Sequence, residues 1–164
     1  MMKVAALQYC ASDDAVQTLH HIKPLIAEAA SHARLITLPE CASFLASSYE
    51  QLQQKAEWDD DSFSQNWFAQ ASQEFGVWLL AGSLIIRKRN NNQLVNRSVL
   101  FGPNGEVVAS YDKIHMFNAE PGDGKNYNES ASFTAGHSPV LVNIDNIPTG
   151  MSVCYDVRFP HLYR

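Results

Sequence analysis

Three residues with complementary chemistry, Glu40, Lys113 and Cys154, are widely separated in the chain. A thiol attacks only as its thiolate, and a neighbouring carboxylate can take the proton as a general base. An ammonium about 4 Å from a thiolate attracts it by about 4 kcal/mol at an effective dielectric near 20, so Lys113 is expected to lower the pKa of the thiol against the effect of burial. The same ammonium and the Tyr155 backbone N–H would hold the oxyanion of a tetrahedral intermediate. Together these groups supply what acyl transfer from an amide requires.

The segments before these residues predict that the three side chains meet. Each residue follows a short apolar run that indicates a buried strand, and the runs are residues 35–38, 107–111 and 151–153. Parallel strands of one sheet bring their carboxyl ends to the same edge, where open α/β sheets place their ligands. Cys154 is therefore expected at a sharp turn after a strand, before a helix that begins at Pro160.

The rest of the chain alternates between the two hydrophobic periodicities, which predicts an α/β fold in one domain, residues 1–164. A stretch of irregular composition at 118–136 precedes the last pair of strands, and such stretches in compact domains are usually functional. We predict strands at 3–8, 33–38, 77–86, 96–101 and 106–110, and helices at 13–32 and 62–75.

Composition excludes several classes of protein. The chain has 46% hydrophobic and 18% charged residues, the balance of a globular protein, and its net charge of −5 with dispersed basic residues argues against a nucleic-acid partner. No segment approaches the roughly 20 apolar residues that span a membrane. Three cysteines without a Cys-x-x-Cys pair argue against a disulfide framework and a zinc site, and they favour a cytoplasmic location.

Three sequence blocks resemble the motifs of the nitrilase superfamily of carbon–nitrogen hydrolases, in the same order and at similar spacing. They are Leu-Pro-Glu at 38–40, Tyr-Asp-Lys-Ile-His-Met-Phe at 111–117 and Val-Cys-Tyr-Asp-Val-Arg-Phe-Pro at 153–160. The resemblance implies an αββα sandwich, commonly dimeric, without a metal or an organic cofactor. The sequences of the second and third blocks are most similar to those of the branch of amidases that act on small ω-amides and deaminated glutathione.

Carried over position by position, the resemblance implies Glu40 as the base, Lys113 as the electrostatic stabiliser and Cys154 as the nucleophile. It also implies that Glu129 positions Lys113 and the substrate.

Around these residues, His115 is expected to be a hydrogen-bonding residue of the site, and a Cys–His dyad is the alternative. Arg158 is expected to pair with a nearby carboxylate or to recognise a substrate carboxylate. Taken alone, Cys154 would more often be a buried packing cysteine, and Lys113 would be a surface lysine.

The chain ends at Arg164, barely one turn after Pro160, so the sequence predicts the N-terminal portion of the sandwich, truncated after the nucleophile turn. The expected function is hydrolysis of a small carboxamide through a thioester on cysteine, with release of ammonia and, for the full-length protein, as a homodimer. Two alternatives stay open. One is an inactive fragment or interaction module that retains the motif residues, and the other is acyl transfer to an amine or alcohol.

Overall fold

One mixed β-sheet runs through the computed structural model, which describes residues 1–120, 122 and 126–164. Its strands follow the order β1-β2-β4-β5-β6, with the short β3 beside β4. β1, β2 and β4 are parallel, whereas β5 is antiparallel to β4 and to β6. β6 therefore runs in the same direction as β2, and both strands end at one edge of the sheet. The bounds are β1 Val4–Ala6, β2 Leu35–Thr37, β3 Glu57–Trp58, β4 Trp78–Arg87, β5 Leu94–Phe101 and β6 Val107–Asp112.

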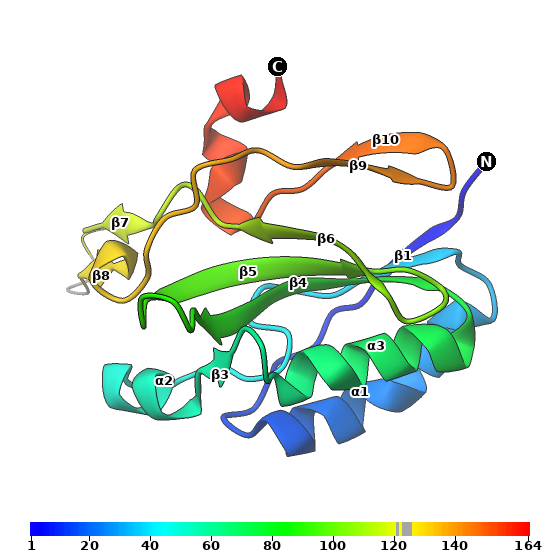
Figure 1. The fold of residues 1–164 in the computed structure, drawn as a ribbon, viewed down its shortest axis with the longest axis horizontal. Coiled ribbons are helices and arrows are strands. Elements are labelled where there is room, and N and C mark those ends of the chain that lie inside the picture. Colours follow the sequence, from blue (N-terminus) through cyan, green and yellow to red (C-terminus); the bar gives the residue numbers. More distant parts are fainter. Residues whose placement is uncertain (121, 123–125) are drawn as a thin grey trace.

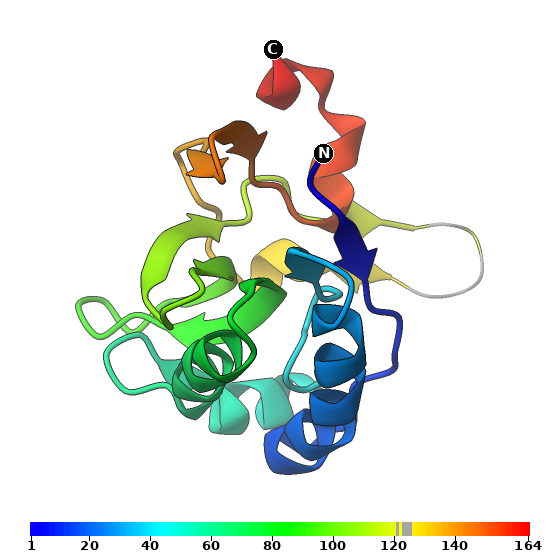
Figure 2. The same cartoon turned by 90° about the vertical axis from the view of Figure 1, so that its right-hand side faces the viewer.

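Two helices cover one face of this sheet (Figures 1 and 2). α1 spans Ala15–Ala30 and α3 spans Phe63–Phe75, and each begins after a side chain that caps its first turn, Asp14 and Ser62 respectively. The short α2, Tyr49–Lys55, has no buried residue. The helices and the sheet share a core that includes Leu19, Ile22, Ile26, Phe68, Ala71, Leu79, Val99 and Phe101.

A hairpin lies over the opposite face of the sheet (Figure 1). It consists of β9, Leu141–Ile144, and β10, Ile147–Gly150, joined by two residues that both have positive φ, as a type I′ turn requires. A second, smaller core holds it against the sheet and includes Leu35, Leu100, Tyr111, Ile144, Met151 and Val153.

The segments that carry the site are short and mostly irregular. β7, Asn118–Ala119, pairs with β8, Tyr127–Asn128, within the stretch predicted to be irregular. Three 3₁₀ helices follow in the chain, at Glu129–Ala131, Cys154–Arg158 and Pro160–Tyr163.

The predicted strand at residues 151–153 is wrong. Met151 N still donates to Val140 O at 3.0 Å, but Val153 N donates to the side chain of Asp156 at 2.9 Å, so the strand ladder ends before Cys154. Met151 and Val153 are buried because they pack in the smaller core against the sheet. An apolar run alone does not distinguish such packing from a strand.

None of the helices in the described part of the chain is both long and apolar enough to cross a membrane.

Candidate active site

Glu40 is held at the end of β2 by a bulge in the neighbouring strand β4. The register of β4 against β5 shifts between Ala81 and Leu84. A Cβ on Gly82 would lie 2.1 Å from the Leu38 carbonyl oxygen, so only glycine allows the chain to pass this closely. Next to it, Ser83 accepts from the backbone N–H of Cys41 through Oγ at 2.8 Å. The bulge therefore fixes the turn that presents Glu40.

Lys113 leaves β6 at the same edge and is 1% exposed. Its Nζ lies 2.9 Å from Glu40 Oε1 and 2.9 Å from each carboxylate oxygen of Glu129. Burial alone would lower the pKa of Lys113, but its hydrogen bonds to Glu129 and Glu40 outweigh burial and raise the pKa above its ordinary value. The ammonium is therefore charged and shared between two carboxylates.

Glu129 has no oxygen left for proton transfer. Its Oε1 accepts from Lys113 and, at 3.3 Å, from Asn96 Nδ2, and its Oε2 accepts from Lys113 and from the Phe117 backbone N–H at 2.7 Å. Glu40 differs, because its two bonds, from Lys113 and from Asn96 Nδ2 at 2.7 Å, both reach Oε1. Glu40 and Glu129 have four carboxylate oxygens between them. Within the described residues, Glu40 Oε2 is the one that accepts no hydrogen bond from Lys113 or Asn96.

Cys154 begins its 3₁₀ helix with a φ of 49°, a left-handed conformation that non-glycine residues seldom adopt. Its thiol is exposed and lines a pocket of about 420 Å³ together with Glu40, Lys113 and Glu129. Backbone strain of this kind clusters at functional sites. The side chains of Phe117, Tyr127 and Phe133 also line the pocket.

Lys113 lowers the pKa of the Cys154 thiol, as expected, but our expectation that this effect outweighs burial is wrong. Partial burial, the negative charge of Glu40 and a hydrogen bond to Glu40 raise the pKa of Cys154, and the opposing effect of Lys113 is smaller. The reason is that Lys113 is already neutralised by two carboxylates. At neutral pH the thiol is therefore mostly protonated, and its reaction needs a base.

Asp156 anchors the turn that carries Cys154. It is fully buried and accepts from Val153 N at 2.9 Å, from Tyr111 Oη at 2.7 Å and from His115 N at 3.0 Å, and His115 Nδ1 lies 2.7 Å from it. Burial raises the pKa of Asp156, but these hydrogen bonds outweigh burial and leave it below the ordinary value. One carboxylate thus joins the turn that carries Cys154 to the segment that follows Lys113.

Replacing Asp156 with asparagine is expected to destabilise the protein by about 2–4 kcal/mol, because an amide nitrogen accepts none of these hydrogen bonds and buried donors lose their partner. Since the pKa of Asp156 is depressed in the folded state, its contribution is complete at neutral pH and declines as the pH falls through the acidic range. Urea unfolding at pH 7 and pH 4 measures both effects. Asp60→Asn, at a site 57% exposed, is the control and should change stability by less than about 0.5 kcal/mol. Equal stability of the Asp156 variant and the parent at pH 7 would contradict the anchoring role.

The remaining candidate residues are His115, Tyr155 and Arg158. His115 stacks on Phe159, with ring centroids 3.7 Å apart, and bonds to Asp156 through Nδ1, so its placement fits a hydrogen-bonding residue. Tyr155 packs edge-on against Phe117. Arg158 is exposed and forms no ion pair within the described residues, which corrects the expected carboxylate pairing.

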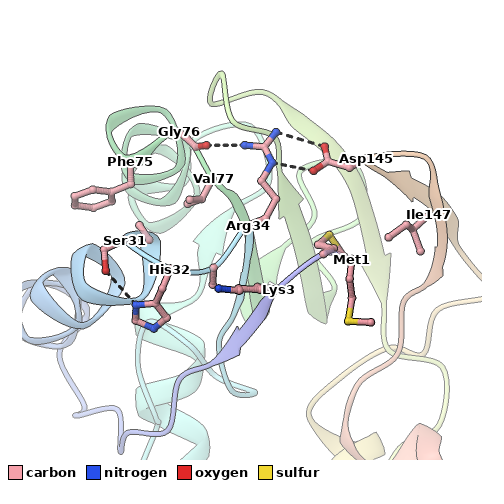
Figure 3. A pocket seen from close by; sticks show the side chains of 13 residues that line it. Met1, Lys3, Ser31, His32, Arg34, Phe75, Gly76, Val77, Asp145 and Ile147 are labelled. Carbon is pink, nitrogen blue, oxygen red and sulfur yellow. Dashed lines mark hydrogen bonds and ion pairs between the residues drawn. The ribbon is translucent and has the colours of Figure 1, made fainter.

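A larger pocket of about 830 Å³ lies at the opposite edge of the sheet, where the parallel strands begin (Figure 3). Arg34 crosses it and donates to Gly76 O and to Asp145 Oδ2, at 2.8 Å each, so it ties the end of α3 to the β9–β10 hairpin. Glu40, Lys113 and Cys154 all lie at the other edge. These three residues line the smaller pocket and not this one.

Comparison with known proteins gives a consistent result. The chain matches the carbon–nitrogen hydrolase family over residues 3–164. It is 33% identical to the deaminated glutathione amidase of Yersinia enterocolitica, with 98% of this chain and 57% of that protein covered, and 30% identical to the chloroplastic omega-amidase of Arabidopsis thaliana, with 97% and 44% covered. Its fold matches Saccharomyces cerevisiae Nit3, a member of branch 10 of the nitrilase superfamily, with a TM-score of 0.84 at 23% identity over 98% of this chain and 58% of that chain.

The fold is thus the α/β fold of the nitrilase superfamily, and the predicted fold class is confirmed. The chain belongs to the carbon–nitrogen hydrolase family. It spans about half the length of the curated relatives that it matches.

Proposed function

We propose that this chain carries the nucleophile, base and cation of a thiol-dependent amidase that hydrolyses a small carboxamide and releases ammonia. The observation that carries the proposal is the convergence of Glu40, Lys113 and Cys154 on one pocket from three distant parts of the chain. Relatives of the chain are named amidases, which supports this class of reaction.

In the first half of the reaction, Glu40 takes the proton of the Cys154 thiol while the sulfur bonds to the amide carbonyl carbon. The carbonyl electrons move onto the oxygen. The charge of Lys113 stabilises this oxyanion, and the Tyr155 backbone N–H, which belongs to the first turn of its 3₁₀ helix and has no partner within it, donates to it. The intermediate then collapses, the C–N bond breaks, and the proton held by Glu40 passes to the departing nitrogen, which leaves as ammonia.

In the second half, water hydrolyses the thioester. Glu40 takes one proton of the water as its oxygen bonds to the acyl carbon, the C–S bond breaks, and the sulfur of Cys154 recovers the proton. The sum is one amide and one water converted to one carboxylic acid and one ammonia. Glu40 acts as base in both halves, whereas the fully engaged Glu129 orients Lys113.

The proposed substrate is a short amide. The pocket is small and three aromatic residues line it, which suits a short acyl chain with a carboxamide at its end. The free cysteines fit a reducing cytoplasm, the location that we propose, and a homodimer of the complete protein stays part of the proposal.

The test is ammonia release from a panel of short ω-amides by the folded chain. The proposal predicts turnover that depends on Cys154. A folded chain that releases no ammonia and forms no adduct on Cys154 would favour the inactive fragment or interaction module. Ester or substituted amide formed in the presence of an alcohol or amine, in place of the free acid, would favour acyl transfer.

A further inference from the structure

Asn96 contacts every charged member of the cluster. The stretch Asn-Arg-Ser at 96–98 also resembles the family pattern, but the resemblance gave Asn96 no role in the site. It lies on β5 and is 2% exposed. Its backbone carbonyl accepts from the Lys113 backbone N–H at 2.9 Å. Its side-chain Nδ2 donates to Glu40 Oε1 at 2.7 Å and to Glu129 Oε1 at 3.3 Å. One residue thus aligns the cation and both carboxylates.

The orientation of the Asn96 amide is fixed by its neighbours. If the amide were reversed, Oδ1 would face two carboxylate oxygens, and all three groups are acceptors. In the orientation observed, Oδ1 is buried and has no hydrogen-bond partner among the described residues. A buried acceptor without a partner destabilises a protein, so no hydrogen bond of Oδ1 accounts for this orientation, whereas the two hydrogen bonds of Nδ2 do.

The amide also decides which oxygen of Glu40 is available. Asn96 and Lys113 both bind Oε1, which leaves Oε2 of this pocket residue without a hydrogen bond from either donor. The Asn96 amide is neutral, so it donates to both carboxylates without adding charge to a cluster of two carboxylates and one ammonium. An aspartate at this position would add a third negative charge and lose the donor.

We propose that Asn96 is a positioning residue of this site: its amide holds Glu40 Oε1 and Glu129 Oε1 on Lys113, so that Glu40 Oε2 is the oxygen that accepts the thiol proton. This inference rests on the proposed function, because it concerns the base that activates Cys154. It adds a specific neutral donor to the three charged groups.

The test compares Asn96→Leu with the parent chain. Leucine has a similar volume, and it removes both the donor and the buried carbonyl without a partner. The probe is p-nitrophenyl acetate, whose reaction is followed by p-nitrophenolate release and by the mass of the peptide that contains Cys154. We expect acylation of Cys154 to slow by about tenfold or more at pH 7. We also expect the pH profile of acylation to change, because Glu40 loses the donor that holds its Oε1. The melting temperature should stay close to that of the parent. If Asn96 only filled space, its replacement would not slow acylation while leaving the melting temperature unchanged.

Two further variants keep the inference falsifiable. Asn104→Leu, in an exposed turn, should leave the rate and the pH profile unchanged. Should the leucine variant fail to fold, Asn96→Asp, which preserves shape, must show the same loss. An unchanged acylation rate and pH profile in whichever variant folds would overturn the role of Asn96. Absence of acylation at Cys154 in the parent chain would instead overturn the proposed function, and this inference with it.

Discussion

Replacing Cys154 with alanine is expected to lower the turnover of a short amide by about 10⁴- to 10⁶-fold, since loss of the nucleophile removes the covalent pathway altogether. The substitution removes one sulfur atom at an exposed position, so the melting temperature should not change. Ammonia release under saturating substrate measures the effect.

The two other cysteines supply the comparison. Cys10 is exposed and does not line the pocket, and Cys10→Ala should retain the full rate. Burial, followed by the charge of Glu40, raises the pKa of Cys41 to about 12, so this thiol is almost never ionised at neutral pH. If turnover survives in Cys154→Ala, or is lost in Cys10→Ala, the assignment of the nucleophile is wrong.

Replacing Lys113 with methionine is expected to destabilise the fold by about 3–5 kcal/mol, because it leaves two carboxylates facing one another without their shared cation. Turnover should also fall by about 10²- to 10³-fold, since the oxyanion loses a stabilising positive charge. Urea unfolding at pH 7 measures the first effect, and ammonia release measures the second.

A double variant separates charge from packing at Lys113. Glu129→Gln combined with Lys113→Met removes one negative charge together with the cation. If repulsion between the carboxylates causes the loss, the double variant should be more stable than Lys113→Met alone at pH 7. Equal stability of the two would mean that lost packing, rather than uncompensated charge, explains the effect.

The sequence predicted the parts of the site that depend on local order along the chain. Glu40 and Lys113 follow strands that run in the same direction, so the expected convergence at one edge of the sheet is observed, although β5 lies antiparallel between β4 and β6. Cys154 also reaches this edge, but by a turn anchored on Asp156 and not by a strand end.

The sequence did not predict the neutral and buried partners. Asn96 meets Glu40 across 56 positions of the chain, and Asp156 meets His115 across 41, and no local pattern encodes such contacts. Asp156 stands in the third motif block and in a turn, where aspartate commonly binds backbone N–H groups, but neither signal named its partners. The pKa of Cys154 was predicted with the wrong sign because one cation was weighed without the two carboxylates that neutralise it.

The central claim is that the Glu40 carboxylate faces the Cys154 thiol, and Glu40→Gln tests it most directly. Glu40 raises the pKa of this thiol through its charge and its hydrogen bond, so the neutral variant should have a lower thiol pKa. The measurement is the rate of iodoacetamide alkylation of Cys154 as a function of pH, resolved by peptide mass. The midpoint is expected to move to lower pH in Glu40→Gln while amide turnover is lost. An unchanged midpoint would mean that the carboxylate does not act on the thiol and that Glu40 is not its base.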